Sequence, residues 1–74
     1  MEDVSSKKKI LIVEDDVNLG FMLERYLNCE YYSTHREKSA GGGIKEASKN
    51  IYSLFLVDIG LPDASGFQVV EFIL

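Results

Sequence analysis

Four carboxylates at the ends of two apolar runs are the residues of this chain best suited to chemistry. Glu14, Asp15 and Asp16 follow the first run, and Asp58 ends the second. Carboxylate oxygens gathered at one point suit a hard cation such as Mg²⁺. Without a cation, their negative charges raise one another's pKa values. We therefore predict a Mg²⁺ site built from these acids.

The two apolar runs predict strands that would bring the carboxylates together. Residues 9–13 and 53–58 are short, aliphatic and apolar on both faces, as buried parallel strands are. In an open α/β sheet, ligands bind in the crevice outside the carboxyl ends of the strands. The acids would therefore meet in that crevice.

A helix is predicted after each of the strands. Asp16 is the expected N-cap of a helix over residues 17–27. A second helix, over residues 40–49, should start late or fray, because its three glycines cost roughly 1 kcal/mol each against alanine. Ser65 and Gln68 form a capping-box pattern ahead of a third helix. The predicted inward faces are Leu19, Met22, Leu23, Tyr26 and Leu27, then Ile44 and Ala47, then Phe67, Val70, Ile73 and Leu74.

The alternation of strands and helices predicts an α/β fold with a parallel sheet and right-handed crossovers. Residues 31–34 are predicted to form a short edge strand, and residues 35–39 a charged loop in which His35 is solvated and unpartnered. Residues 1–7 are predicted to be a disordered tail. The chain ends on apolar residues, 72–74, so we expect the N-terminal part of a larger domain.

The composition is that of a globular protein. The chain has 74 residues, 46% of them hydrophobic and 27% charged, with a net charge of −4. A negative charge argues against a nucleic-acid surface within this chain. We expect no membrane span, because no apolar stretch approaches 18 residues. One cysteine, Cys29, leaves no partner for an internal disulfide.

Two stretches carry a resemblance to a known family. Residues 9–16, KILIVEDD, with Asn18, Leu19 and ERYL at 24–27, resemble the opening of a two-component response-regulator receiver domain. Residues 56–67, LVDIGLPDASGF, resemble that family's phosphorylation-site strand and loop. The spacing between the stretches is also that of the family, and the likeness covers residues 8–74. The detail is most similar to receivers of DNA-binding regulators with a C-terminal winged helix.

The resemblance implies a flavodoxin-like, doubly wound parallel sheet of order 2-1-3-4-5, truncated here after the third helix. It implies that Asp58 accepts a phosphoryl group from a phosphohistidine on a sensor histidine kinase. Asp15, Asp58 and the backbone carbonyl of Gly60 would ligate Mg²⁺ directly, and Glu14 mostly through a bound water. Asp16 falls outside the family's acidic pair.

The resemblance also carries expectations about the whole protein. It would be a cytoplasmic phosphoprotein that performs its own phosphorylation chemistry and is not otherwise an enzyme. It would control transcription through an output domain that lies outside this chain and makes the contact with DNA. The present residues would not bind DNA, and the protein could form a homodimer. The family's Thr or Ser after the fourth strand and Lys after the fifth have no counterpart in these residues.

Two alternative functions remain open from the sequence. A Mg²⁺-dependent phosphatase of the haloacid-dehalogenase kind also uses a strand-end Asp nucleophile, but such enzymes resemble one another in having an acid two residues later, where this chain has Gly60. The other alternative is an interaction module that is not phosphorylated. It would use the bare edge of the third strand, which offers unpaired hydrogen-bonding groups.

Overall fold

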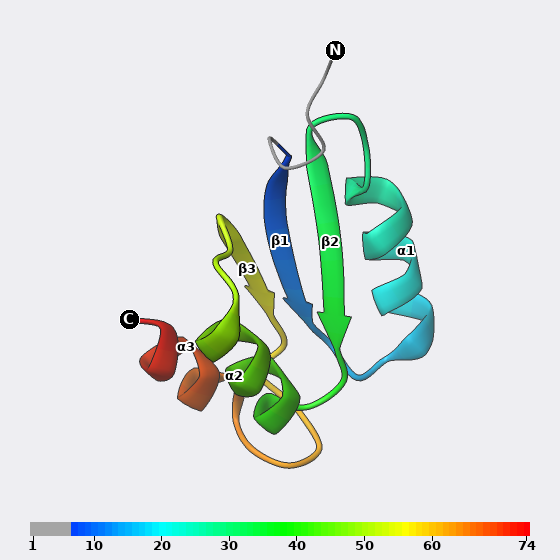
Figure 1. Cartoon of the computed structure of the whole chain (residues 1–74). Helices are drawn as coiled ribbons and strands as arrows, with labels where there is room; N and C mark the ends of the chain where they lie inside the picture. The colour runs from blue at the N-terminus through cyan, green and yellow to red at the C-terminus, as the bar shows by residue number, and fades with distance from the viewer. Residues whose placement is uncertain (1–6) are drawn as a thin grey trace.

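The computed structural model describes residues 7–74 as three strands and three helices that alternate along the chain (Figure 1). The tail predicted for residues 1–7 falls outside the described residues, apart from Lys7. The elements are β1 (Lys8–Val13), α1 (Val17–Leu27), β2 (Tyr32–Glu37), α2 (Ala40–Lys49), β3 (Leu54–Val57) and α3 (Gly66–Ile73).

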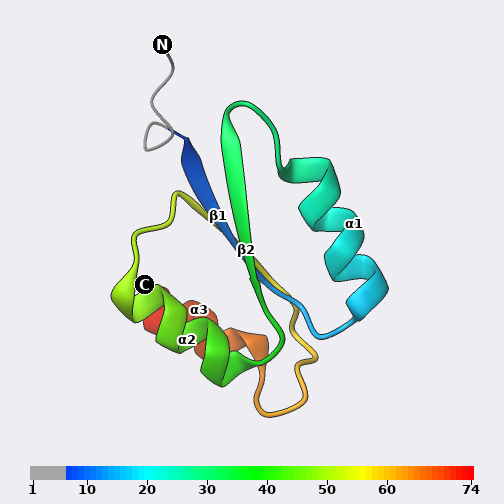
Figure 2. The same cartoon turned by 45° about the vertical axis from the view of Figure 1, so that its right-hand side comes forward.

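The strands form a parallel sheet of order β2-β1-β3, as the predicted 2-1-3 order requires. The central strand is the most buried element, since the side chains from Ile10 to Val13 are at most 2% exposed. Helix α1 lies on one side of the sheet, and α2 and α3 lie on the other (Figure 2). This arrangement confirms the doubly wound α/β architecture.

The hydrophobic core lies between the sheet and the layer of α2 and α3. Helix α2 approaches β1 closely at Gly43, where an added Cβ would lie 2.8 Å from a methyl carbon of Val13. The absence of a side chain at this position therefore lets the helix reach the sheet. The buried core residues are Leu11, Val13, Ala40, Leu61 and Val69, with Ile44, Ala47, Phe55 and Val57 packed against them.

Strand β2 is longer than the sequence indicates, and the charged loop predicted for residues 35–39 is wrong over its first three residues. The strand pairs with β1 along its whole length, from Lys8 opposite Tyr32 to Val13 opposite Glu37. Its charged residues find partners on the covering helices. On the α1 side, Arg36 Nε donates to Glu24 Oε1 at 3.0 Å. Pairing and ion-pair formation therefore outweigh the low strand propensity of these residues.

Helix α2 begins at Ala40 and includes all three glycines, so the predicted late start is wrong. Three backbone N–H groups in its first turn have side-chain acceptors. Asp63, from the loop before α3, accepts from the N–H of Ala40 at 2.8 Å and from that of Gly41 at 2.9 Å. Ser39, the N-cap, accepts from Gly42 N–H at 3.0 Å. These caps offset the low helix propensity of glycine.

We predict that Asp63→Ala lowers Tm at pH 7 by about 2–8 °C, as the loss of a helix cap does. The N–H groups of Gly41 and Ala40 hold the pKa of Asp63 below its ordinary value. The stabilisation of the fold by ionised Asp63 is therefore present above the pKa that Asp63 has in the unfolded chain. It is lost as pH falls through the lower pKa of Asp63 in the folded chain. Thermal melts should show the difference at pH 7 and a smaller one at acid pH. Glu71→Ala, at an exposed α3 position, is the control, and equal losses would contradict the prediction.

Helix α1 has the predicted bounds and the predicted cap, because Leu19 N–H donates to Asp16 Oδ1 at 3.0 Å. Its predicted inward face is only partly correct. Leu23 and Leu27 are half-buried, whereas Leu19, Met22 and Tyr26 are exposed. The described part of the chain offers α1 only the sheet to pack on, and the sheet covers a narrow strip of the helix.

Helix α3 begins after its predicted cap, Ser65, whose Oγ accepts from Phe67 N–H at 3.2 Å. Its predicted inward face is correct at Ile73 but wrong at Phe67, Val70 and Leu74, which are exposed, and it misses the fully buried Val69. The inward face is Gly66, Val69 and Ile73. Gly66 sets this rotation, because it lies directly against the backbone of Asp58.

The helices within residues 7–74 are all too short or too polar to cross a bilayer.

Candidate functional site

The acidic residues lie where β1 and β3 end side by side. The hydrogen bonds of the sheet continue one residue past each strand. Asp58 N–H donates to the carbonyl of Val13 at 2.9 Å, and Glu14 N–H donates to the carbonyl of Glu37 at 3.0 Å. Glu14 and Asp58 are therefore held by backbone bonds at the carboxyl end of the sheet.

Glu14, Asp15 and Asp58 come together as the sequence predicts. One carboxylate oxygen from each lies within 4.8 Å of the others. Glu14 is 8% exposed, Asp58 is half-buried and Asp15 is exposed. Three anionic oxygen donors at this spacing, with an open side, suit a hard divalent cation. Asp16 lies outside this group and caps α1.

The electrostatics of Glu14 reflect its position beside two other acids. Burial raises the pKa of its carboxyl, and the negative charges of Asp58 and Asp15 add to the effect. The hydrogen bond from Asp16 N–H to Glu14 Oε2, at 3.1 Å, opposes this shift in the pKa. A groove of about 240 Å³ runs alongside, lined by Ile12, Glu14, Leu23, Leu56, Val57 and Asp58. Its apolar walls reduce the solvation of Glu14, the most buried of the three acids.

The loop after Asp58 is folded back onto the site. Asp58 Oδ1 accepts from Gly60 N–H at 3.2 Å. Gly60 forms a bridge with Ser65, and Gly66 N–H donates to the carbonyl of Ile59 at 2.9 Å. These bonds fix the backbone of Gly60 beside Asp58. Metal ligation by the Gly60 carbonyl stays a prediction.

Two residues support the site in ways that sequence reasoning missed. Arg36 Nη1 donates to the backbone carbonyl of Glu14 at 3.2 Å, which places a cation behind the acids. The sequence suggested only a loop at Arg36. An added Cβ on Gly66 would overlap the carbonyl oxygen of Asp58. A glycine at the entry to α3 was visible in the sequence, but its contact with Asp58 was not.

We predict that Glu14→Gln raises Tm at pH 7, in metal-free buffer, by about 2–5 °C. A carboxyl with a raised pKa binds its proton more tightly in the folded state. The contribution of Glu14 to the free energy of unfolding is therefore most favourable below its ordinary pKa of 4.5, and it is lost as pH rises through the pKa of the folded state. Glutamine keeps an acceptor for Asp16 N–H but carries no charge. The gain should disappear near pH 3.5 in thermal melts, and a loss of stability at pH 7 would contradict the prediction.

Comparison with known proteins identifies the family and the fold. No protein-family model matches the chain. The transcriptional regulatory protein RprY of Bacteroides fragilis is 37% identical over 71 residues, which are 96% of this chain and 30% of that protein. A CheY-like response regulator receiver domain from Methanospirillum hungatei superimposes with a TM-score of 0.85 at 35% identity. That match covers 89% of this chain and 53% of that one.

This chain belongs to the response-regulator receiver domains.

A third similar receiver is the response regulator TrrA of Thermotoga maritima. Its structure with Mg²⁺ and BeF has a TM-score of 0.84 at 30% identity, over 89% of this chain and 57% of that one. TrrA has also been solved in complex with the histidine kinase ThkA, with a TM-score of 0.82. The present sequence thus spans 53% of the Methanospirillum hungatei receiver chain, 57% of the TrrA chain and 30% of RprY. The predicted family and flavodoxin-like fold are confirmed.

Proposed function

We propose that this receiver is the phosphoacceptor of a two-component response regulator and that Asp58 takes the phosphoryl group. The observation that carries the proposal is the meeting of Asp58 with Glu14 and Asp15, with one oxygen of each within 4.8 Å of the others, at the end of a parallel sheet. A single strand-end aspartate would be unremarkable, but a carboxylate nucleophile beside two further acids fits phosphoryl transfer.

In the proposed reaction, a carboxylate oxygen of Asp58 attacks the phosphorus of a phosphohistidine. A new O–P bond forms and the N–P bond breaks, and the departing imidazole nitrogen takes a proton from solvent. Glu14, Asp15, Asp58 and the Gly60 carbonyl would hold a Mg²⁺, which when bound offsets the charge of the phosphoryl oxygens. The backbone bonds of Asp58 and Gly60 hold the nucleophile in place for the attack.

The donor and the output of the signal belong to the same proposal. TrrA binds Mg²⁺ with BeF in one structure and the histidine kinase ThkA in another, which supports a cation and a sensor kinase as partners here. RprY is a transcriptional regulatory protein, which supports control of transcription through an output domain outside these residues. We further propose a cytoplasmic location, no turnover chemistry beyond self-phosphorylation, and no direct contact with DNA by this acidic chain. Homodimer formation stays a prediction.

The test is incubation of the intact protein with Mg²⁺ and acetyl phosphate, followed by intact mass measurement. We expect a gain of one phosphoryl group per chain, which should vanish when EDTA removes the cation. The adduct should be lost in hydroxylamine, as an acyl phosphate is. No mass gain with Mg²⁺, or an equal gain in EDTA, would overturn the proposal. Continuous hydrolysis of a phosphate ester would favour the phosphatase alternative.

A further inference from the structure

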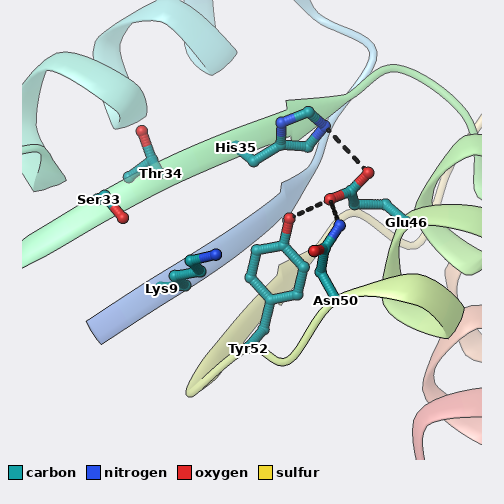
Figure 3. Close-up of a pocket in the computed structure, with 7 residues that line it drawn as sticks. All are labelled: Lys9, Ser33, Thr34, His35, Glu46, Asn50 and Tyr52. Atoms are coloured by element: carbon teal, nitrogen blue, oxygen red, sulfur yellow. Dashed lines mark hydrogen bonds and ion pairs between the residues drawn. The ribbon is translucent and has the colours of Figure 1, made fainter. Parts of the chain in front are cut away.

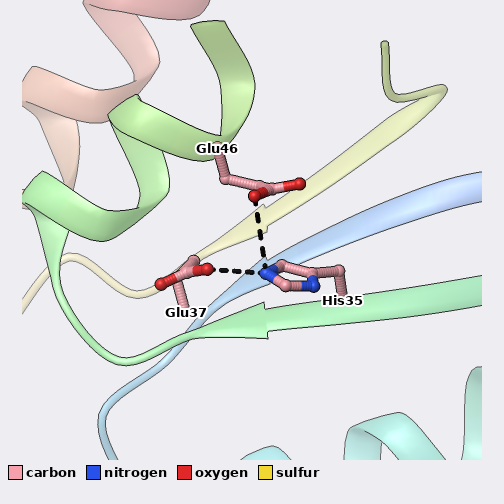
Figure 4. A group of neighbouring side chains, drawn as sticks. All are labelled: His35, Glu37 and Glu46. Atoms are coloured by element: carbon pink, nitrogen blue, oxygen red, sulfur yellow. Dashed lines mark hydrogen bonds and ion pairs between the residues drawn. The ribbon is translucent and has the colours of Figure 1, made fainter. Parts of the chain in front are cut away.

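A second cluster of metal-ligating side chains lies away from the acidic site, between β2 and α2 (Figure 4). His35 Nε2 lies 2.6 Å from Glu37 Oε2 and 3.7 Å from Glu46 Oε1. The three residues offer ligand atoms that all lie within 4.8 Å of one another. His35 is therefore exposed, as predicted, but the prediction that it has no partner is wrong.

The parallel sheet and α2 create this cluster. His35 and Glu37 are two residues apart on β2, so their side chains lie on the same face of the sheet. Glu46 reaches them from α2, which packs over that face (Figure 4). The sequence conceals the arrangement, because it depends on a strand that extends to Glu37 and on a helix that begins at Ala40.

Glu46 is the fixed member of the cluster, since only 8% of its surface is exposed. Its Oε2 accepts from Tyr52 OH at 2.5 Å and from Asn50 Nδ2 at 2.7 Å, and Figure 3 shows both bonds. The hydrogen bond from Tyr52 is the main reason that the pKa of Glu46 lies below its usual value. The carboxylate therefore stays ionised although it is buried.

The other oxygen of Glu46 faces the cluster. Its neighbours among the described residues are His35 Nε2 at 3.7 Å and Lys49 Nζ at 3.9 Å. Both distances exceed those of a hydrogen bond. This oxygen thus points at a histidine nitrogen and has no direct donor among the described residues. The Glu46 side chain is 10% exposed, and a charge with so little solvent around it normally has a hydrogen-bond partner or a bound metal.

We propose that His35, Glu37 and Glu46 bind a transition-metal ion, with Zn²⁺ as the reference ion. One imidazole nitrogen and two carboxylate oxygens form a donor set that Zn²⁺ accepts at about 2.0–2.2 Å. A neutral imidazole and two carboxylates balance the charge of a divalent ion. The acidic site, which offers only oxygen, instead suits Mg²⁺.

The surroundings complete the site. A cavity of about 230 Å³ adjoins it, lined by Lys9, Ser33, Thr34, His35, Glu46, Asn50 and Tyr52, and gives water access to an open coordination position (Figure 3). Tyr52 and Asn50 orient Glu46 from behind, as partners of metal ligands do. Lys49 and Lys9 are the nearby cations with which the ion competes.

Binding also fixes the tautomer of His35. The ion takes the lone pair of Nε2, so a proton on Nε2 moves to Nδ1 in the neutral ring. Metal ligands bind in their deprotonated forms, so Zn²⁺ competes with protons for these side chains. Glu37, 29% exposed at its side chain, can rotate to admit the ion between its carboxylate and the ring.

The experiment uses the intact, untagged protein with Cys29→Ser, because the exposed thiol of Cys29 could bind Zn²⁺ itself. Calorimetric titration with ZnCl₂ should give one site per chain that is removed or weakened roughly tenfold or more by His35→Gln. Tyr52→Phe should weaken it by a similar factor, because Glu46 then loses its orienting bond. His35 is the single histidine among these 74 residues, and the imidazole NMR signals that disappear in His35→Gln are the ones that report its ligation.

Asp15→Asn is the control that separates this site from the acidic one, and it should leave Zn²⁺ affinity unchanged. Circular dichroism verifies that each variant is folded. Unchanged affinity in folded His35→Gln, or imidazole signals that do not move when Zn²⁺ binds, would overturn the proposal. Loss of binding in Asp15→Asn would assign the ion to the acidic cluster instead.

Discussion

Asp58→Asn should reduce phosphoryl uptake from acetyl phosphate or a sensor kinase by roughly 100-fold or more, as loss of a nucleophile does. The amide has nearly the shape of the carboxylate, so the backbone bonds of residue 58 and the fold should persist. It lacks the anionic oxygen that attacks phosphorus and is a weaker ligand for a cation. Intact mass measurement after a timed reaction gives the labelled fraction directly.

Asp63→Asn is the matched control, because Asp63 lies in the same loop but caps α2 and is not part of the acidic cluster. This variant should be labelled as the parent protein is. Equal labelling of Asp58→Asn and the parent would refute the assignment of the nucleophile. Labelling lost from both variants would point to the conformation of the loop as the cause.

Gly66→Ala should destabilise the protein by at least about 2 kcal/mol, the range for overpacking in a closely packed site. The φ angle of Gly66 is negative, so the need for glycine here is one of space alone. A methyl group would overlap the carbonyl oxygen of Asp58 and crowd the Cα of Ile59. Both are backbone atoms and cannot rotate away, so either α3 or the strand end must move.

Gly60→Ala provides the comparison within the same loop, since an added Cβ there meets no atom within 4 Å. Urea denaturation of both variants measures the difference in the free energy of unfolding. Gly60→Ala should lie close to the parent, whereas Gly66→Ala should unfold at clearly lower urea concentration. Similar midpoints for the two variants would contradict this account of Gly66.

Much of the fold could be predicted from local pattern. The bounds of α1, its Asp16 cap and the apolar run of β1 depend on residues near one another in the chain, so the sequence predicts them well. Strand β2 and the first turn of α2 depend on distant partners, namely β1 and Asp63. Intrinsic helix and strand propensities underestimate the stability of both segments, because they take no account of such distant partners.

The two metal-ligating clusters differ in the same way. Glu14, Asp15 and Asp58 end apolar runs, and the topology of parallel strands makes their meeting predictable. His35 and Glu46 meet only because α2 crosses the face of β2, and no spacing along the chain signals that contact. The inward rotation of α3 was missed for a related reason, since it is set by the contact of Gly66 with a backbone atom.

Because Asp63 caps α2, the stability of the first turn of that helix depends on the position of the loop that follows Asp58. Three consecutive glycines give this turn little intrinsic tendency to be helical, and the two N–H bonds to Asp63 compensate for that. A charge added at Asp58 that displaces the loop would therefore also change the free energy of winding the helix. By thermodynamic linkage, unwinding the glycine turn would change the free energy of placing the loop by the same amount. Such a displacement of the loop would couple the order of a helix end to the occupancy of a strand end.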